Sequence, residues 1–90
     1  MGFNFEELGV YKKAINFVSN IYSSTKGFPK EETFGLTSQL RRAAVSIPSN
    51  ISEGSARTKK DFSHFIDIAR GSLFECVTLV QISVNTSALS

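Results

Sequence analysis

The sequence predicts an all-α protein: an antiparallel helical bundle whose helices run up, down and up. Apolar residues recur at intervals of three and four over three long stretches, which places them on one face of a helix. Glycine and proline interrupt these stretches at short connections, and short connections make sequential helices antiparallel neighbours. We expect helices at about residues 6–26, 31–53 and 58–84 in one domain that covers residues 1–90.

The stretch 6–26 predicts a helix with a wide apolar side. Its apolar residues form two adjacent stripes, Leu8, Tyr11, Ile15, Val18 and Tyr22 on one and Val10, Ala14, Phe17 and Ile21 on the other. Together they cover about half of the cylinder, more than the roughly 100° stripe of an ordinary surface helix. We therefore expect contacts on two sides, one of them with another subunit. Gly27 in a left-handed cap and Pro29 are expected to end this helix.

The stretch 31–53 predicts a second helix that contains a proline. Glu31 and Glu32 lie where the positive end of a helix favours acidic side chains, and Gly54 is expected to end the helix. One face carries Leu36, Leu40, Ala43, Ala44, Ile47 and Ile51. Pro48 lacks a backbone N–H, so the helix is either kinked there or broken in two. Because the apolar spacing keeps its phase across Pro48, we predict a kink.

The stretch 58–84 predicts the third helix. Thr58 is a good N-cap, and Asp61 three residues later makes a shortened capping box. The expected core stripe, widened on one flank by Ile68 and Leu79, is Phe62, Phe65, Ile66, Ala69, Leu73, Cys76, Val77, Val80 and Val84.

Composition argues against several classes of protein. No stretch reaches the roughly 20 apolar residues of a membrane helix, and acidic residues near the start replace the basic residues of an export signal. The single cysteine, Cys76, cannot form an intramolecular disulfide, which fits a reducing compartment. The single histidine, His64, lies on a polar face without a second ligand or a nucleophile motif. We expect a cytoplasmic, non-enzymatic protein with no metal, cofactor, membrane partner or small-molecule substrate.

One polar seam follows the second helix beside its apolar face. It consists of Gln39, Arg42, Ser46, Asn50 and Glu53, at spacings of three or four. Arg42 and Glu53 are too far apart to pair along one helix, so each is expected to find its partner elsewhere. We interpret the seam as an interhelical network near Pro48 or a contact with another subunit.

Basic residues form a second candidate site. Arg and Lys bind nucleic acid by neutralising phosphates, and a helix N-terminus adds amide donors. The candidate residues are Arg41, Arg42, Arg57, Lys59 and Lys60. The net charge is only +2, so an ordinary solvated surface explains the same residues.

The middle of the chain, residues 35–54, reads GLTSQLRRAAVSIPSNISEG. It resembles the signature of the four-helix bundle proteins encoded in intervening sequences of bacterial large-subunit ribosomal RNA genes, and the resemblance extends over about residues 5–80. It implies a kinked second helix and a ring-shaped homopentamer. Relatives include the accessory variability determinant of diversity-generating retroelements, a basic pentameric partner of nucleic acid. Unlike the family, the chain stops at Ser90, so we expect a four-helix bundle lacking most or all of its fourth helix.

Two functional hypotheses follow. The first is a non-enzymatic, self-associating helical scaffold whose basic residues contact RNA or DNA. The second is a purely structural or protein–protein interaction module, in which the same arginines satisfy interhelical or intersubunit partners. Under the second hypothesis, Arg42→Ala disturbs folding or assembly first.

Overall fold

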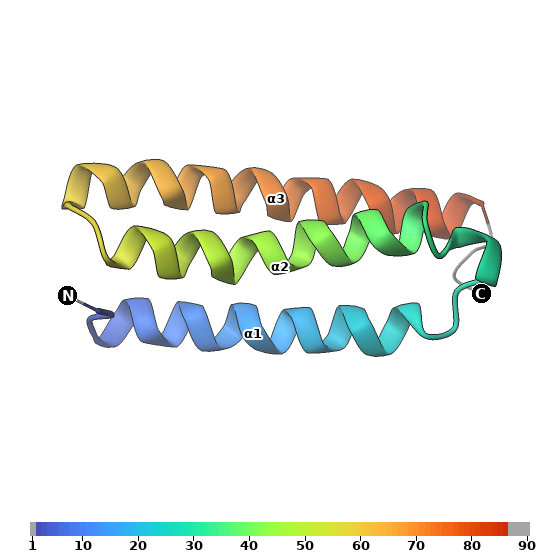
Figure 1. Cartoon of the computed structure of the whole chain (residues 1–90), viewed down its shortest axis with the longest axis horizontal. Coiled ribbons are helices and arrows are strands. Elements are labelled where there is room, and N and C mark those ends of the chain that lie inside the picture. Colours follow the sequence, from blue (N-terminus) through green and yellow to red (C-terminus); the bar gives the residue numbers. More distant parts are fainter. Residues whose placement is uncertain (1, 87–90) are drawn as a thin grey trace.

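The computed structural model describes residues 2–86, and all of the regular structure in that range is helical. The helices are α1 (Phe5–Thr25), α2 (Leu36–Ser55) and α3 (Lys59–Asn85), with a short 3-10 turn, η1 (Lys30–Glu32), before α2. The prediction of an all-α protein is confirmed. Figure 1 shows the helices side by side along the long axis, with the chain reversing direction at each connection. Within residues 2–86, no helix is long and apolar enough to cross a membrane.

Both ends of α1 differ from the prediction. The helix begins at Phe5 because Asn4 and Glu7 form a reciprocal capping box, in which the Glu7 N–H donates to Asn4 Oδ1 at 2.8 Å. The prediction of a left-handed cap at Gly27 is wrong, since its φ lies outside the left-handed region. Instead, the chain continues in a right-handed turn in which the Phe28 N–H donates to the Thr25 carbonyl at 3.0 Å.

The second helix starts later than predicted and includes both Pro48 and Gly54. Residues 30–35 form the 3-10 turn and a tight turn, and α2 begins at Leu36, whose N–H donates to the Glu32 carboxylate at 3.3 Å. Glu32 therefore caps α2 from the preceding turn. The helix runs without a break past Pro48 to Ser55. Gly54 does not end it, which corrects that prediction.

At Gly54 the backbone of α2 lies close against α3. A Cβ atom added there would lie 2.8 Å from Phe65 Cβ and 3.0 Å from Phe62 Cδ1. Real Cβ atoms do not approach other heavy atoms so closely. Glycine is therefore needed at this position for packing rather than for an unusual backbone conformation.

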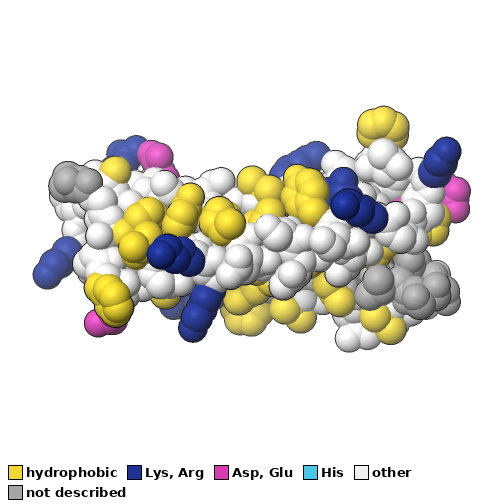
Figure 2. Space-filling view, turned by 90° about the horizontal axis from the view of Figure 1, so that it is seen from below, with side chains coloured by type: hydrophobic (Ala, Val, Ile, Leu, Met, Phe, Trp, Pro, Cys, Tyr) yellow, Lys and Arg dark blue, Asp and Glu magenta, His cyan; other side chains and the backbone are white. Residues whose placement is uncertain are grey.

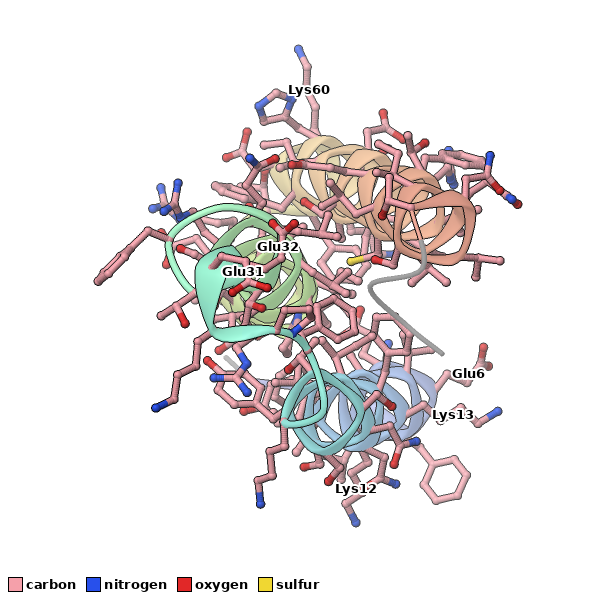
Figure 3. All side chains as sticks on the ribbon, turned by 90° about the vertical axis from the view of Figure 1, so that its right-hand side faces the viewer. Glu6, Lys12, Lys13, Glu31, Glu32 and Lys60 are labelled. Atoms are coloured by element: carbon pink, nitrogen blue, oxygen red, sulfur yellow. The ribbon has the colours of Figure 1, made fainter. Side chains whose placement is uncertain are left out.

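The core is centred on α2. All apolar residues predicted for its inner face are buried, which confirms that face. In Figure 3, which looks along the helices, α1 and α3 lie on either side of α2. No Cα atom of α1 lies within 8 Å of a Cα atom of α3 over the described residues. Each outer helix thus packs on α2 alone.

The buried face of α3 corrects the predicted core stripe. Ala69, Cys76 and Leu79 are buried, whereas Leu73, Val77 and Val84 are 43%, 59% and 52% exposed. Two serines, Ser72 and Ser83, lie on the buried face instead of these apolar residues. Because α3 contacts only α2, it buries one narrow face and leaves a second apolar stripe uncovered. The Thr58 cap is confirmed, since its hydroxyl accepts the Asp61 N–H at 3.2 Å.

Candidate interaction surfaces

The predicted basic residues do not form one patch. Arg41 and Arg42 lie early in α2, whereas Arg57, Lys59 and Lys60 surround the turn between α2 and α3. At 1.5 Å per helical residue, these two groups are about 20 Å apart along the axis. Figure 3 shows Lys12 and Lys60 projecting from opposite sides of the molecule, so the lysines of α1 do not join them.

Arg41 is held against α1. Its Nε–H donates to the hydroxyl of Thr25 at 2.8 Å, and a terminal N–H donates to the Tyr22 carbonyl at 3.3 Å. Its guanidinium carbon also lies 4.5 Å from the centre of the Tyr22 ring, a cation–π arrangement. Arg41 therefore binds the end of α1 to α2, and two of its five N–H donors are used within the chain.

Arg42 lies about 100° further around α2 than Arg41. A terminal N–H donates to the Ser38 hydroxyl at 3.3 Å on the same helix. The expectation that Arg42 also has a partner outside its own helix stays a prediction. Glu53 forms an exposed ion pair with Arg57, just beyond the end of its own helix.

Arg41→Ala is expected to lower the free energy of unfolding by about 1–2 kcal/mol, because it removes two charge-assisted hydrogen bonds and a cation–π contact. Arg42→Ala is expected to change it by less than about 0.5 kcal/mol, as for most exposed positions. Urea unfolding of both variants measures the difference. A larger loss for Arg42→Ala would contradict this assignment and favour the original expectation.

The polar seam forms one interhelical contact. Ser72 Oγ of α3 donates to Ser46 Oγ of α2 at 2.9 Å, and Asn50 Nδ2 donates to the Ser46 carbonyl at 2.7 Å. A cavity of about 200 Å³ opens beside this contact and is lined by Gln39, Arg42, Ala43, Ser46, Ser72 and Glu75. Ser46 thus joins the two helices and Asn50 bonds Ser46 within α2, whereas Gln39, Arg42 and Glu53 remain exposed.

No cluster in the described residues suggests catalysis. His64 is exposed and its ring lies edge-on to Phe65. Residues 2–86 contain no group of three or more His, Cys, Asp or Glu side chains that could hold a metal ion. Cys76 is buried in the core, and burial, with a smaller contribution from Glu75, raises the pKa of its thiol. The thiol therefore stays protonated and unreactive at neutral pH.

An apolar groove runs along α2 between α1 and α3. Ile47 and Ile51 form its floor, Val10 forms one wall, and Ile66 and Leu73 form the other. Two adjoining hollows of about 210 and 280 Å³ lie along it. The prediction that α1 has apolar sides facing two ways agrees with this groove, since Val10 lines it while Tyr11 and Ile15 do not.

A second apolar surface lies on the other side of α1, where it meets α2. We call it the α1–α2 surface, and it consists of Tyr11, Ile15, Val18, Val45 and Pro48, around a pocket of about 530 Å³. Figure 2, which looks onto the α1 side, shows hydrophobic side chains in two bands along the molecule, with basic side chains between them. Sequence reasoning missed this pocket, because it requires the relative position of two helices.

Comparison with known proteins identifies one family. A model of the family described as 23S rRNA-intervening sequence protein matches residues 6–90. The match includes all three helices. No curated protein matches the chain.

Proposed function

The chain belongs to the 23S rRNA-intervening sequence protein family, and from that premise we propose that it is a non-enzymatic, self-associating helical scaffold. In this proposal the chain is an antiparallel up-down-up bundle, kinked at Pro48. A second copy of the chain covers the apolar residues that α3 leaves exposed.

The observation that carries the proposal is an apolar stripe on α3 that is only partly covered. We call it the α3 stripe, and it consists of Ile66, Leu73, Val77, Val80 and Val84; Leu73, Val77 and Val84 are exposed, whereas Ile66 and Val80 are half-buried against the core. Its successive spacings of 7, 4, 3 and 4 residues are those of the apolar seam of a coiled coil. Such a seam packs on another helix, and Ile66 and Leu73 line the groove beside it. The sequence pattern identified all five residues but assigned them to the core, and the exposure of Leu73, Val77 and Val84 corrects that assignment.

A second copy suits this surface because the stripe is complementary to itself. Two α3 helices related by a two-fold axis would each present an apolar seam to the other. Burying a Leu or Val side chain contributes about 1.5–3 kcal/mol, and both copies contribute the same residues. The exposed fractions of 43% for Leu73 and 59% for Val77 leave much of this energy available.

Val77→Asp is expected to lower the mass of the assembly, because a charge cannot be buried in the seam without a partner. Thr78→Asp is the matched control, since it adds the same charge to the neighbouring exposed position outside the stripe. Sedimentation equilibrium measures the mass against the 9.9 kDa of one chain. The proposal would be refuted if the wild-type protein is a monomer at its highest soluble concentration. It would also be refuted if the wild-type and Val77→Asp proteins have equal masses.

Nucleic-acid binding is a second candidate function, favoured by Lys59 and Lys60. Both are exposed in the first turn of α3, and the ion pairs among residues 2–86 involve other residues. Self-association would repeat this basic turn on each copy of the assembly and so increase the number of phosphates that the assembly can contact. Arg57 contributes less in this proposal, because it pairs with Glu53 and lies over the Phe65 ring.

Titration with structured RNA and duplex DNA at low and moderate salt tests this candidate. Replacing Lys59 and Lys60 by Ala is expected to weaken binding and to reduce the salt dependence for duplex DNA by about two counterions. Replacing Lys12 and Lys13 by Ala is the control, with the same change of charge on another helix. If the wild-type protein does not bind at low salt, the protein–protein interaction module remains.

A further inference from the structure

A hollow of about 470 Å³ lies where the end of α1 meets the start of α2, on a part of the molecule that the proposed function does not use. Its volume is within the range of about 300–1,000 Å³ that is common for ligand sites. Its lining includes two aromatic rings, Tyr22 and Phe34, and two guanidinium groups, Arg41 and Arg42, together with three hydroxyl side chains. No carboxylate of the described residues lines it, so the hollow is positively charged.

Both aromatic rings are accessible at this hollow. Phe34 is 96% exposed and lies in a turn that is held by a hydrogen bond from the Gly35 N–H to the Glu32 carbonyl, at 3.1 Å. Tyr22 is 40% exposed, and the guanidinium carbon of Arg41 lies 4.5 Å from the centre of its ring. The backbone that carries Phe34 and the ring of Tyr22 are thus ordered before a ligand binds, which reduces the entropy lost on binding.

The two arginines of the hollow keep hydrogen-bond donors for an anion. Of the five N–H donors of each guanidinium, Arg41 uses two, on Thr25 and Tyr22, and Arg42 uses one, on Ser38. The ion pairs among residues 2–86 involve neither arginine. A planar guanidinium binds two oxygens of a phosphate through parallel hydrogen bonds, so the hollow is suited to a ligand that carries phosphate.

We infer that this hollow binds an unpaired nucleotide of a single-stranded nucleic acid, with its base stacked on Phe34 and its phosphate bound by Arg42. The inference rests on nucleic-acid binding, the second candidate function above, and gives it a separate site and a strand type. Proteins hold single strands in this way, by stacking bases on aromatic rings beside cations that bind the backbone. An acidic peptide would satisfy the arginines without a base to stack on Phe34, and the bases of a duplex are already stacked on one another.

This site is distinct from the basic turn at Lys59 and Lys60. Phe34 precedes α2 and Lys59 follows it, at opposite ends of a helix of 20 residues, or about 30 Å. Every residue that lines the hollow belongs to one chain, so the site is complete without assembly. Its presence therefore does not depend on the α3 stripe.

The test is a fluorescence-anisotropy titration of the full chain with three short strands of equal length: thymidine DNA, uridine RNA and abasic DNA. The thymidine or the uridine strand is expected to bind roughly 5-fold to 150-fold more tightly than the abasic strand, because only its bases stack. Phe34→Ala should remove this difference. Arg42→Ala should weaken the binding of all three strands and lower the slope of log affinity against log salt by about 0.7. The DNA and RNA strands separate the two sources of the nucleotide, and binding of either supports the site.

Matched controls separate the hollow from general effects of ring and charge. Phe5→Ala removes a ring that is 92% exposed but lies outside the hollow, and it should keep the preference for strands with bases. Lys12→Ala removes a positive charge from the exposed side of α1 and should weaken binding less than Arg42→Ala does. Circular dichroism should show the same helix content in all of these variants.

The inference would be overturned by equal affinities for all three strands, or by a preference for bases that survives Phe34→Ala. It would also be overturned if a glutamate peptide of the same charge displaces the bound strand as effectively as unlabelled strand does. Duplex binding that needs Lys59 and Lys60, without any single-strand binding, would overturn the inference and leave the proposed function intact. Single-strand binding that needs Phe34 but not these lysines would support it even if no duplex binds.

Discussion

Leu40→Ala should lower the free energy of unfolding by about 2–5 kcal/mol, the range for removing a large aliphatic side chain from a packed core. Leu40 lies on the inner face of α2 and is only 2% exposed. A domain of this size is stable by about 5–15 kcal/mol, so the variant should lose a large share of that stability. The effect is large because α2 alone carries the contacts that hold both outer helices.

Urea unfolding of Leu40→Ala should be measured in protein carrying Val77→Asp, since assembly would otherwise add to the apparent stability. Ile68→Ala is the matched control: it removes a large aliphatic side chain from a position that is 39% exposed. Ile68→Ala should lower the free energy of unfolding by much less than Leu40→Ala does. Equal losses would show that α2 is not the centre of the core.

Gly54→Ala should destabilise the protein by about 1–3 kcal/mol, although alanine normally favours a helix. The new Cβ would lie 2.8 Å from Phe65 Cβ, an atom close to the α3 backbone that cannot move alone. The Phe62 Cα atom, 3.4 Å away, limits movement in the same direction. This steric clash can therefore be removed only if α2 and α3 move apart. That movement loses packing along both helices.

Gly71→Ala, on α3, is expected to have the opposite effect on stability. An added Cβ at Gly71 would meet no atom within 4 Å, so only the helical preference changes and stability should rise by up to about 1 kcal/mol. Thermal unfolding of the two variants compares the effects directly. If both variants gain stability, the close approach at Gly54 does not limit the packing of α2 on α3.

Local patterns in the sequence account for most of the secondary structure. The helical period identified the buried face of α2, and Thr58 was identified as the cap of α3, because both depend on residues a few positions apart. The start of α1 was also readable, since Asn4 and Glu7 have the spacing of a capping box. The start of α2 could not be predicted from the sequence, because Glu32 caps this helix from a separate turn.

The sequence alone therefore determined an all-helical protein, the inner face of its central helix, and the family to which it belongs. Only the tertiary structure decided which apolar stripe of α3 faces α2, since both stripes have the helical period. The contact of Gly54 with Phe62 and Phe65 decides this rotation, and it places Ala69 and Cys76 inward and Val77 outward. Likewise, Arg41 and Arg42 are neighbours in sequence but diverge by about 100° around α2, so one contacts α1 and the other does not.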